Sequence, residues 1–139
     1  MSQQPVIPRP LPKIDRYTDT APFWKAAKEH RLLIQYCTDT GRAQWFPRSV
    51  SLRTGRRHLE WREVSGEGTV YTFTVTQRAW PGHEDRAPYV VALVELPEGV
   101  RVLANVLHCD PDEVRIGMPV RLCWEHLSED IEYPAFEPA

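Results

Sequence analysis

No apolar run in this 139-residue chain reaches the roughly 18–20 residues that a membrane-spanning helix needs. The first five residues also lack the basic region and apolar stretch of a secretory signal. We therefore expect a cytoplasmic protein with no membrane partner. Hydrophobic residues make up 42% of the sequence and charged residues 26%, which is typical of a globular domain rather than a disordered chain.

Groups that could do chemistry are equally scarce. The three cysteines, Cys37, Cys109 and Cys123, are an odd number, which indicates free thiols rather than a disulfide framework. The five histidines show no metal-ligand spacing, and the glycine pair at 66–68 lacks the lysine of a phosphate-binding loop. His58 is an uncertain base for Cys37. We therefore predict no catalytic residue and no enzyme.

Charge is spread unevenly along the chain, whose net charge is -2. Residues 42–62 carry six arginines and one glutamate, a net charge of +5. Residues 63–139 carry five basic and fourteen acidic residues, a net charge of -9. Because an acidic body repels a phosphate backbone, we do not expect nucleic acid to be a partner.

Residue patterns divide the chain into four parts. Four prolines between residues 5 and 12 predict an extended arm over residues 1–18. A capping Thr20 followed by Pro22 predicts an N-terminal helix over residues 19–31. A turn-rich module follows over residues 32–62. Residues 63–139 complete the chain as a separate domain.

The C-terminal part has the period-2 alternation and turn spacing of a β domain. Outside the turn-rich module, strands are expected at 69–77, 89–96, 100–107 and 120–126, and the tail at 133–138 is expected to be extended. These elements favour a mainly β fold, a five-stranded OB-fold barrel preceded by the helix and the small module.

The module at 32–62 has the frame of a zinc ribbon, with two knuckles about a dozen residues apart, each followed by a glycine. The ligand positions of that frame are Cys37, Thr40, Ser51 and Thr54. Neutral hydroxyls are poor zinc ligands. We therefore predict a ribbon-shaped loop without zinc and no other cofactor.

Many short motifs occur together in one order from about residue 20 to the end of the chain. They are Ala21–Trp24, Leu32–Cys37, Phe46–Arg48, Glu60–Trp61, Ser65–Thr74, Ala87–Tyr89, Val94–Leu96 with Gly99, Asp110–Glu113, Ile116–Val120 and Pro134–Phe136. In these motifs the sequence resembles a family of OB-fold proteins with an N-terminal rubredoxin-like zinc ribbon, long regarded as a domain of unknown function. The departure from the family is the loss of three of the four ribbon cysteines.

The resemblance implies a non-catalytic accessory subunit. Such proteins join thiolase-like, aldolase or synthase subunits, including lipid-transfer-type thiolases, and help to hold acyl-CoA or CoA. The residues leave the acyl chain, the identity of the partner and a homodimer open.

Two segments offer candidate ligand-binding residues. The loop after the first long barrel strand contains Arg78, Trp80 and His83, with Tyr89 just beyond it. OB-fold loops often bind ligands, and an indole can cover a pantetheine arm. In the basic segment, Arg53 and Arg56 are candidates for the phosphates of CoA.

Two other functions stay open at this point. A single-stranded nucleic-acid-binding OB-fold protein is the first, because the basic segment also contains Trp45 and Trp61. A thioesterase or acyltransferase that uses Cys37 is the second. Fold alone does not decide between these functions.

Overall fold

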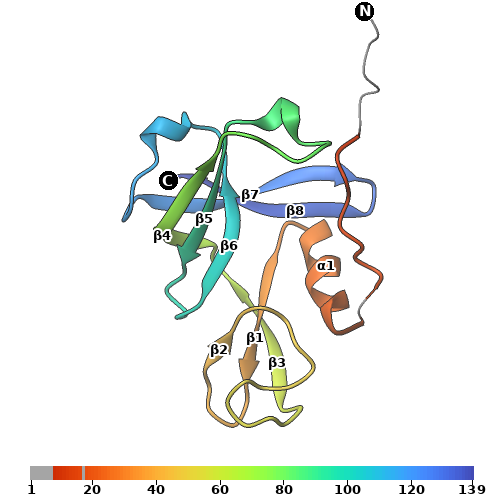
Figure 1. Ribbon diagram of the computed structural model, residues 1–139. Helices are drawn as coiled ribbons and strands as arrows, with labels where there is room; N and C mark the ends of the chain where they lie inside the picture. Colours follow the sequence, from red (N-terminus) through yellow and green to blue (C-terminus); the bar gives the residue numbers. More distant parts are fainter. Residues whose placement is uncertain (1–7, 17) are drawn as a thin grey trace, which may run out of the picture.

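The computed structural model describes residues 8–16 and 18–139. Figure 1 shows a barrel, a small sheet module that projects from it, and a helix beside both. The elements in chain order are η1 (Thr18–Thr20), α1 (Ala21–Lys28), β1 (Leu32–Cys37), β2 (Ala43–Gln44), β3 (Leu59–Val64), β4 (Glu67–Thr76), η2 (Glu84–Arg86), β5 (Tyr89–Glu95), β6 (Arg101–Val106), η3 (Pro111–Glu113), β7 (Pro119–Ser128) and β8 (Ile131–Pro138).

Five strands close the barrel in the order β4-β5-β6-β8-β7. Every pairing is antiparallel except β6 with β8, which is parallel. Strand β5 alternates between buried and half-buried residues along its length, so Val90, Ala92 and Val94 point into the core. The predicted mainly β fold with a five-stranded OB barrel is confirmed.

Strand β8 is longer and more regular than the extended tail that the sequence indicated. It pairs with β7 over most of its length, and Phe136 is fully buried in the barrel core. Pro134 hides the strand pattern, because proline is normally found only at sheet edges or strand starts. The chain therefore needs its last residues to close the barrel.

Helix α1 is shorter than the predicted span of 19–31. It begins after the 3₁₀ turn η1, and His30, with φ of 57°, stops it by adopting a left-handed conformation. Phe23, Ala26 and Ala27 are buried on the face that packs against β1 and β8. The helix thus joins the small sheet to the barrel.

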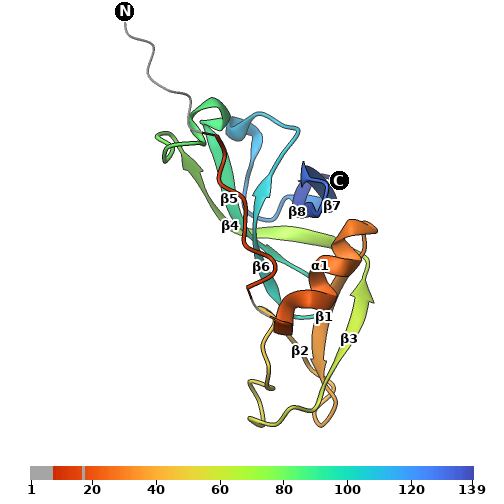
Figure 2. The ribbon, with the colours of Figure 1, turned by 90° about the vertical axis from the view of Figure 1, so that its right-hand side faces the viewer.

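The described part of the N-terminal arm, residues 8–16, lies along its own barrel (Figures 1 and 2). A Cβ atom at Gly82 would lie 2.7 Å from the carbonyl oxygen of Pro8, so the arm and the β4–β5 loop are in close contact. Arg9 Nη1 lies 3.2 Å from Glu125 Oε2. Residues 8–13 form no helix or strand and residues 14–16 turn, so the predicted arm ends in a turn rather than running extended to residue 18; its residues 1–7 and 17 lie outside the described residues.

None of the helices in the described part of the chain combines the length and the hydropathy that crossing a membrane requires.

Candidate functional site

The small sheet module has the backbone of a zinc ribbon. Strands β2, β1 and β3 form its antiparallel sheet, and each predicted knuckle is closed by the same hydrogen bond. Gly41 N–H donates to Cys37 O at 2.7 Å, and Gly55 N–H donates to Ser51 O at 2.9 Å. Both glycines have left-handed backbones, with φ of 70° and 71°. The glycine spacing therefore retains the knuckles although the ligand types have changed.

The structure brings Cys37, Thr40 and Ser51 together. Hydrogen bonds lower the pKa of the Cys37 thiol from 9.0 to about 7, chiefly from the Ser51 hydroxyl, then from Thr40. Thr54 occupies the matching position of the second knuckle, is exposed, and accepts a hydrogen bond from Arg56 N–H at 3.2 Å. One thiol and three hydroxyls do not fit zinc, which needs thiolate, imidazole or carboxylate ligands.

Two buried glutamines fix the loop between the knuckles. Gln44 Nε2 donates to Gln35 Oε1 at 2.9 Å and to Val50 O at 3.2 Å, and Gln44 Oε1 accepts from Leu52 N–H at 2.9 Å. Gln35 donates to Arg48 O at 2.7 Å and accepts from Arg48 N–H at 2.8 Å. The sequence analysis missed this network. Its only signal was a polar residue at a core-facing position on each of two strands.

Gln44→Ala is expected to lower the free energy of unfolding by about 2–4 kcal/mol, because it removes three hydrogen bonds and leaves the buried Gln35 amide and two partly buried backbone groups without these partners. Urea denaturation measures the loss, and hydrogen exchange at Leu52 N–H should quicken. The exposed Gln77→Ala is the control and should change neither quantity. Equal effects of both substitutions would contradict a structural role for the network.

The lowered Cys37 pKa predicts a specific pH dependence of stability. Between pH 7 and pH 9 the folded chain binds fewer protons than the unfolded chain at this thiol, so stability rises with pH in that window. The contribution is lost as pH falls through about 7. In reduced samples, Cys37→Ser should flatten this part of the curve of unfolding free energy against pH. An unchanged slope would show that the pKa of Cys37 is not lowered in the folded chain.

A chain of aromatic rings connects the ribbon module to the barrel through α1. Tyr133 of β8 lies 6.0 Å from Trp24, Trp24 lies 4.9 Å from Phe23, and Phe23 lies 5.6 Å from Trp45, measured between ring centroids. The last ring, Phe46, lies 5.8 Å from Trp45 in an edge-to-face arrangement. Such pairs add to the stability from burial. They hold the module against the barrel.

The exposed end of this aromatic chain opens onto an apolar surface. Phe46 is 56% exposed, and Leu103 on β6 is 64% exposed. Between them lies a cavity of about 220 Å³ that is lined by Phe23, Trp24, Trp45, Phe46, Val102, Leu103, Tyr133 and Pro134. Leu103 and Tyr133 also line the cavity between the arm and the barrel, opposite Leu11 of the arm.

We call Leu11, Phe46, Leu52 and Leu103, together with Trp45 and Tyr133, the docking face. The first four are among the seven large hydrophobic side chains that are exposed in the described residues. Leu52 joins the others through a second cavity that it shares with Trp45. Exposed apolar side chains that gather on one face indicate a protein-binding surface.

The residues predicted to bind ligand fall into two separate groups. The β4–β5 loop lies at the top of Figure 1, and the ribbon module with Arg53 and Arg56 lies at the bottom. In the loop, Trp80 is 81% exposed, so it does not pack in the core. The two groups do not line a common pocket in the described structure.

His83 and Tyr89 line a cavity between the arm and the barrel, whereas Arg78 is exposed. Arg86 connects the first two, with its guanidinium 3.3 Å from His83 Nδ1 and its Cζ 5.4 Å from the centre of the Tyr89 ring. Arg86 also lies 3.5 Å from Glu125. His83 and Tyr89 therefore face a cavity whose opposite wall is the arm.

Arg53 lines a cavity of about 470 Å³ between the ribbon module and the β5–β6 turn. Arg101 enters the same cavity from the barrel, with its Cζ 3.6 Å from the centre of the Tyr71 ring and its Nε 3.1 Å from Glu95. Two guanidinium groups at the rim of one cavity suit an anionic ligand.

Cys37 is not placed as a nucleophile. Its side chain is fully buried, so a substrate cannot reach the sulfur in this conformation. The nearest base in the sequence analysis, His58, instead pairs with Asp39 at 2.9 Å. A catalytic cysteine needs an accessible sulfur and a base aimed at it.

Fold and site together define a class: an OB-fold barrel that carries a ribbon module and an apolar docking face. Two family models match the chain, the rubredoxin-like zinc ribbon domain of ChsH2 over residues 24–50 and the C-terminal OB-fold domain of ChsH2 over residues 61–125. A DUF35 domain-containing scaffold protein of Methanocaldococcus jannaschii is 37% identical over 110 residues, which are 77% of each chain. The chain belongs to the DUF35 family, which confirms the resemblance seen in its motifs.

Two further relatives are subunits or assemblies. A probable enoyl-CoA hydratase alpha subunit of Thermomonospora curvata is 38% identical over 137 residues, which are 99% of this chain and 42% of that protein. The chain thus spans less than half the length of that relative. A solved structure named Ltp2-ChsH2(DUF35) aldolase is 36% identical, with a TM-score of 0.81 over 92% of this chain and 98% of that chain.

Proposed function

We propose that this chain is a non-catalytic accessory subunit that docks on a thiolase-like acyl-CoA enzyme. The observation that carries the proposal is the docking face, where the exposed Phe46 and Leu103 line a cavity between ribbon and barrel and two more exposed leucines, Leu11 and Leu52, line the neighbouring cavities. Exposed apolar side chains do not stabilise an isolated domain, whereas a protein interface buries apolar and aromatic side chains of this kind.

The family supports the same function. Its members include DUF35 scaffold proteins, and one solved relative is named together with Ltp2 as an aldolase. Other relatives are named as alpha subunits of CoA-thioester hydratases. Names of this kind belong to subunits of larger enzymes, and the buried Cys37 leaves this chain without an accessible nucleophile in the ribbon.

We further propose that the basic ribbon contributes to binding acyl-CoA at the junction with the partner. Arg53 and Arg56 are both exposed on the second knuckle, and Arg53 faces the cavity that Arg101 shares. Guanidinium forks bind phosphate oxygens in pairs. The β4–β5 loop, which carries Arg78 and Trp80, lies at the far end of the molecule in Figure 1 and is the second candidate surface.

Co-expression with a thiolase-like subunit tests the docking proposal. We expect a stable heteromeric complex on size-exclusion chromatography with light scattering, and acyl-CoA affinity that falls in the complex of the Arg53→Glu, Arg56→Glu double variant. The matched control is Arg115→Glu, an exposed arginine before β7. Absence of a complex would overturn the proposal, whereas a complex with unchanged CoA affinity would overturn only the role of the arginines.

Nucleic-acid binding is expected to be weak. At physiological salt we predict no binding to single-stranded DNA or RNA tighter than about 10 µM, because the basic segment is confined to one module of an acidic chain. A fluorescence anisotropy titration over several salt concentrations measures it. Submicromolar affinity that falls steeply with salt would instead favour the nucleic-acid-binding alternative.

A further inference from the structure

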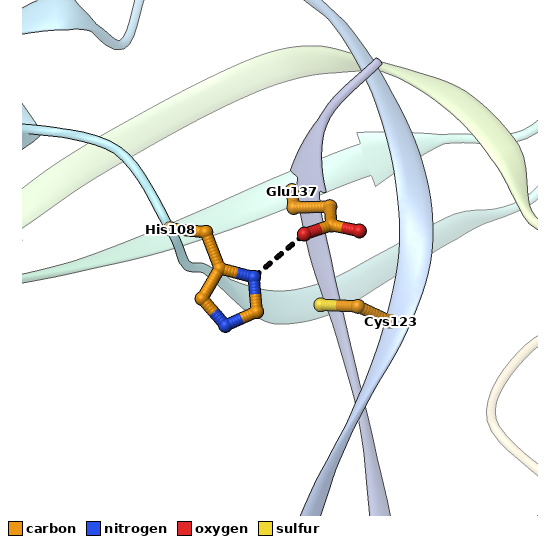
Figure 3. Close-up of side chains that lie close together, drawn as sticks. All are labelled: His108, Cys123 and Glu137. Carbon is orange, nitrogen blue, oxygen red and sulfur yellow. Dashed lines mark hydrogen bonds and ion pairs between the residues drawn. The ribbon is translucent and has the colours of Figure 1, made fainter.

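Three potential metal ligands meet on the outside of the barrel, away from the ribbon module. They are His108 in the turn after β6, Cys123 on β7 and Glu137 on β8 (Figure 3). One ligand atom from each residue lies within 4.8 Å of the other two. His108 Nδ1 lies 2.6 Å from Glu137 Oε2, and Figure 3 shows the thiol of Cys123 directed toward the same point.

The fold itself produces this meeting. Arg121 pairs with Glu137 and Cys123 pairs with Ala135 in the antiparallel β7–β8 register, so Cys123 and Glu137 are diagonal neighbours on one face. Just after β6, Leu107 N–H donates a hydrogen bond to Phe136 O of β8 at 2.7 Å, which fixes the end of β6 against β8. The next residue, His108, adopts φ of 61°, an uncommon conformation for a residue other than glycine.

A neighbouring arginine orients the carboxylate. Arg121 Nε donates to Glu137 Oε1 at 3.2 Å, which leaves Oε2 as the oxygen that faces His108. Metal-binding carboxylates are commonly held by such outer hydrogen bonds. Glu137 and Cys123 are both partly buried, whereas the His108 side chain is 61% exposed. The first two are therefore fixed, and the histidine is free to adjust.

We propose that His108, Cys123 and Glu137 form a binding site for one divalent cation of the zinc class. Imidazole nitrogen, thiolate sulfur and carboxylate oxygen are the three ligand types that zinc uses, and a thiolate disfavours Mg²⁺ and Ca²⁺. Ligand atoms around a tetrahedral zinc lie about 3.5 Å apart, so the His108–Glu137 pair at 2.6 Å must open slightly, and any pair near the 4.8 Å limit must close. Rotation of the exposed His108 side chain provides that movement.

Binding replaces the S–H bond of Cys123 with a metal–sulfur bond and releases the thiol proton to solvent. The proton that His108 Nδ1 donates to Glu137 exchanges through solvent to Nε2, which frees Nδ1 to bind the metal. Three protein ligands leave a fourth tetrahedral position, and the exposed side of His108 opens it to water. The site does not depend on the proposed accessory function. The site differs from the prediction that the chain binds no metal. That prediction considered only the ribbon and the spacing of histidines along the sequence, whereas these three ligands come from distant parts of the chain.

Cobalt(II) titration of the reduced, metal-stripped full chain tests the site. We expect one Co²⁺ per chain, with tetrahedral d–d bands and a sulfur-to-cobalt charge-transfer band in the near ultraviolet. Zinc should displace the cobalt and raise the thermal midpoint. Loss of a ligand should weaken binding at least about 10-fold, since loss of an outer partner already costs that much. His108→Ala and Cys123→Ser should therefore both lose the band.

The controls are the other two thiols, Cys37→Ser and Cys109→Ser, which should both keep the band. His108→Ala changes an exposed side chain, so it keeps the test valid even if Cys123→Ser fails to fold. The proposal is overturned if the native chain shows no charge-transfer band. It is also overturned if the band survives His108→Ala or disappears with Cys37→Ser.

Discussion

The double variant Phe46→Asp, Leu103→Asp is expected to lose its complex with the thiolase-like subunit, with an affinity at least about 100-fold below that of the native chain. Both side chains are more than half exposed in the isolated chain, so the variant should fold normally. In the complex, each new carboxylate would be desolvated against an apolar partner surface, which is strongly unfavourable. Titration of separately purified subunits by interferometry measures the loss.

Ile116→Asp is the matched control for this variant. Ile116 is 69% exposed and lies in none of the cavities of the docking face. It should leave both the affinity and the thermal midpoint unchanged. Normal binding by the double variant, or equal losses in variant and control, would show that the partner uses another surface.

Restoring three thiols should convert the ribbon back into a zinc site. The variant Thr40→Cys, Ser51→Cys, Thr54→Cys completes a four-cysteine set with Cys37 on knuckles whose backbone is already in place. Structural zinc in zinc-finger peptides binds with an apparent free energy of about 10–16 kcal/mol, so even a fraction of it should raise the thermal midpoint markedly. His108→Ala in the same chain removes the barrel cluster from the measurement.

Elemental analysis and calorimetry with and without chelator check this outcome. We expect one zinc per chain in the restored variant, and a thermal midpoint that chelator lowers. With native residues at these three positions, the chain carrying His108→Ala should hold no zinc and should not respond to chelator. Zinc in that chain would contradict the proposal that the ribbon has lost its metal, and a restored variant without zinc would contradict the preserved knuckle geometry.

Local signals predicted much of the fold. Alternating residues predicted β4, a nearly continuous apolar run predicted β5, and the turn at 97–99 predicted the return of the chain as β6. Thr20 and Pro22 predicted the start of α1 near its observed position, although the Thr20 side chain makes no capping hydrogen bond. The spacing of Gly41 and Gly55 predicted both knuckles, because few residues other than glycine adopt a left-handed backbone without strain. These features depend on neighbouring residues alone.

What sequence reasoning missed depends on contacts between distant residues. Strand β8 is defined by its partner β7 rather than by its own proline-containing pattern. The two glutamines of the ribbon serve backbone groups up to thirteen residues away, and no motif marks such a network. His108 and Glu137 are 29 residues apart and meet only because β6 and β8 are neighbours in the barrel.

The docking face was missed for a related reason. Trp45, Phe46 and Leu103 each resemble ordinary core residues in the sequence, and only the structure shows which remain exposed. For the predicted ligand residues, the sequence indicated the residues but not their positions in space. Arg53 and Trp80 were both recognised as candidates, but the sequence could not show that the ribbon and the β4–β5 loop lie at opposite ends of the molecule.

The decisive measurement is turnover of acyl-CoA by this chain and by a thiolase-like subunit, assayed separately and together. We expect no thiolase, thioesterase or acyltransferase turnover by this chain alone. We expect turnover by the complex, at a rate that Cys37→Ser does not change. Turnover by the isolated chain that Cys37→Ser abolishes would contradict the account and make the chain itself the enzyme.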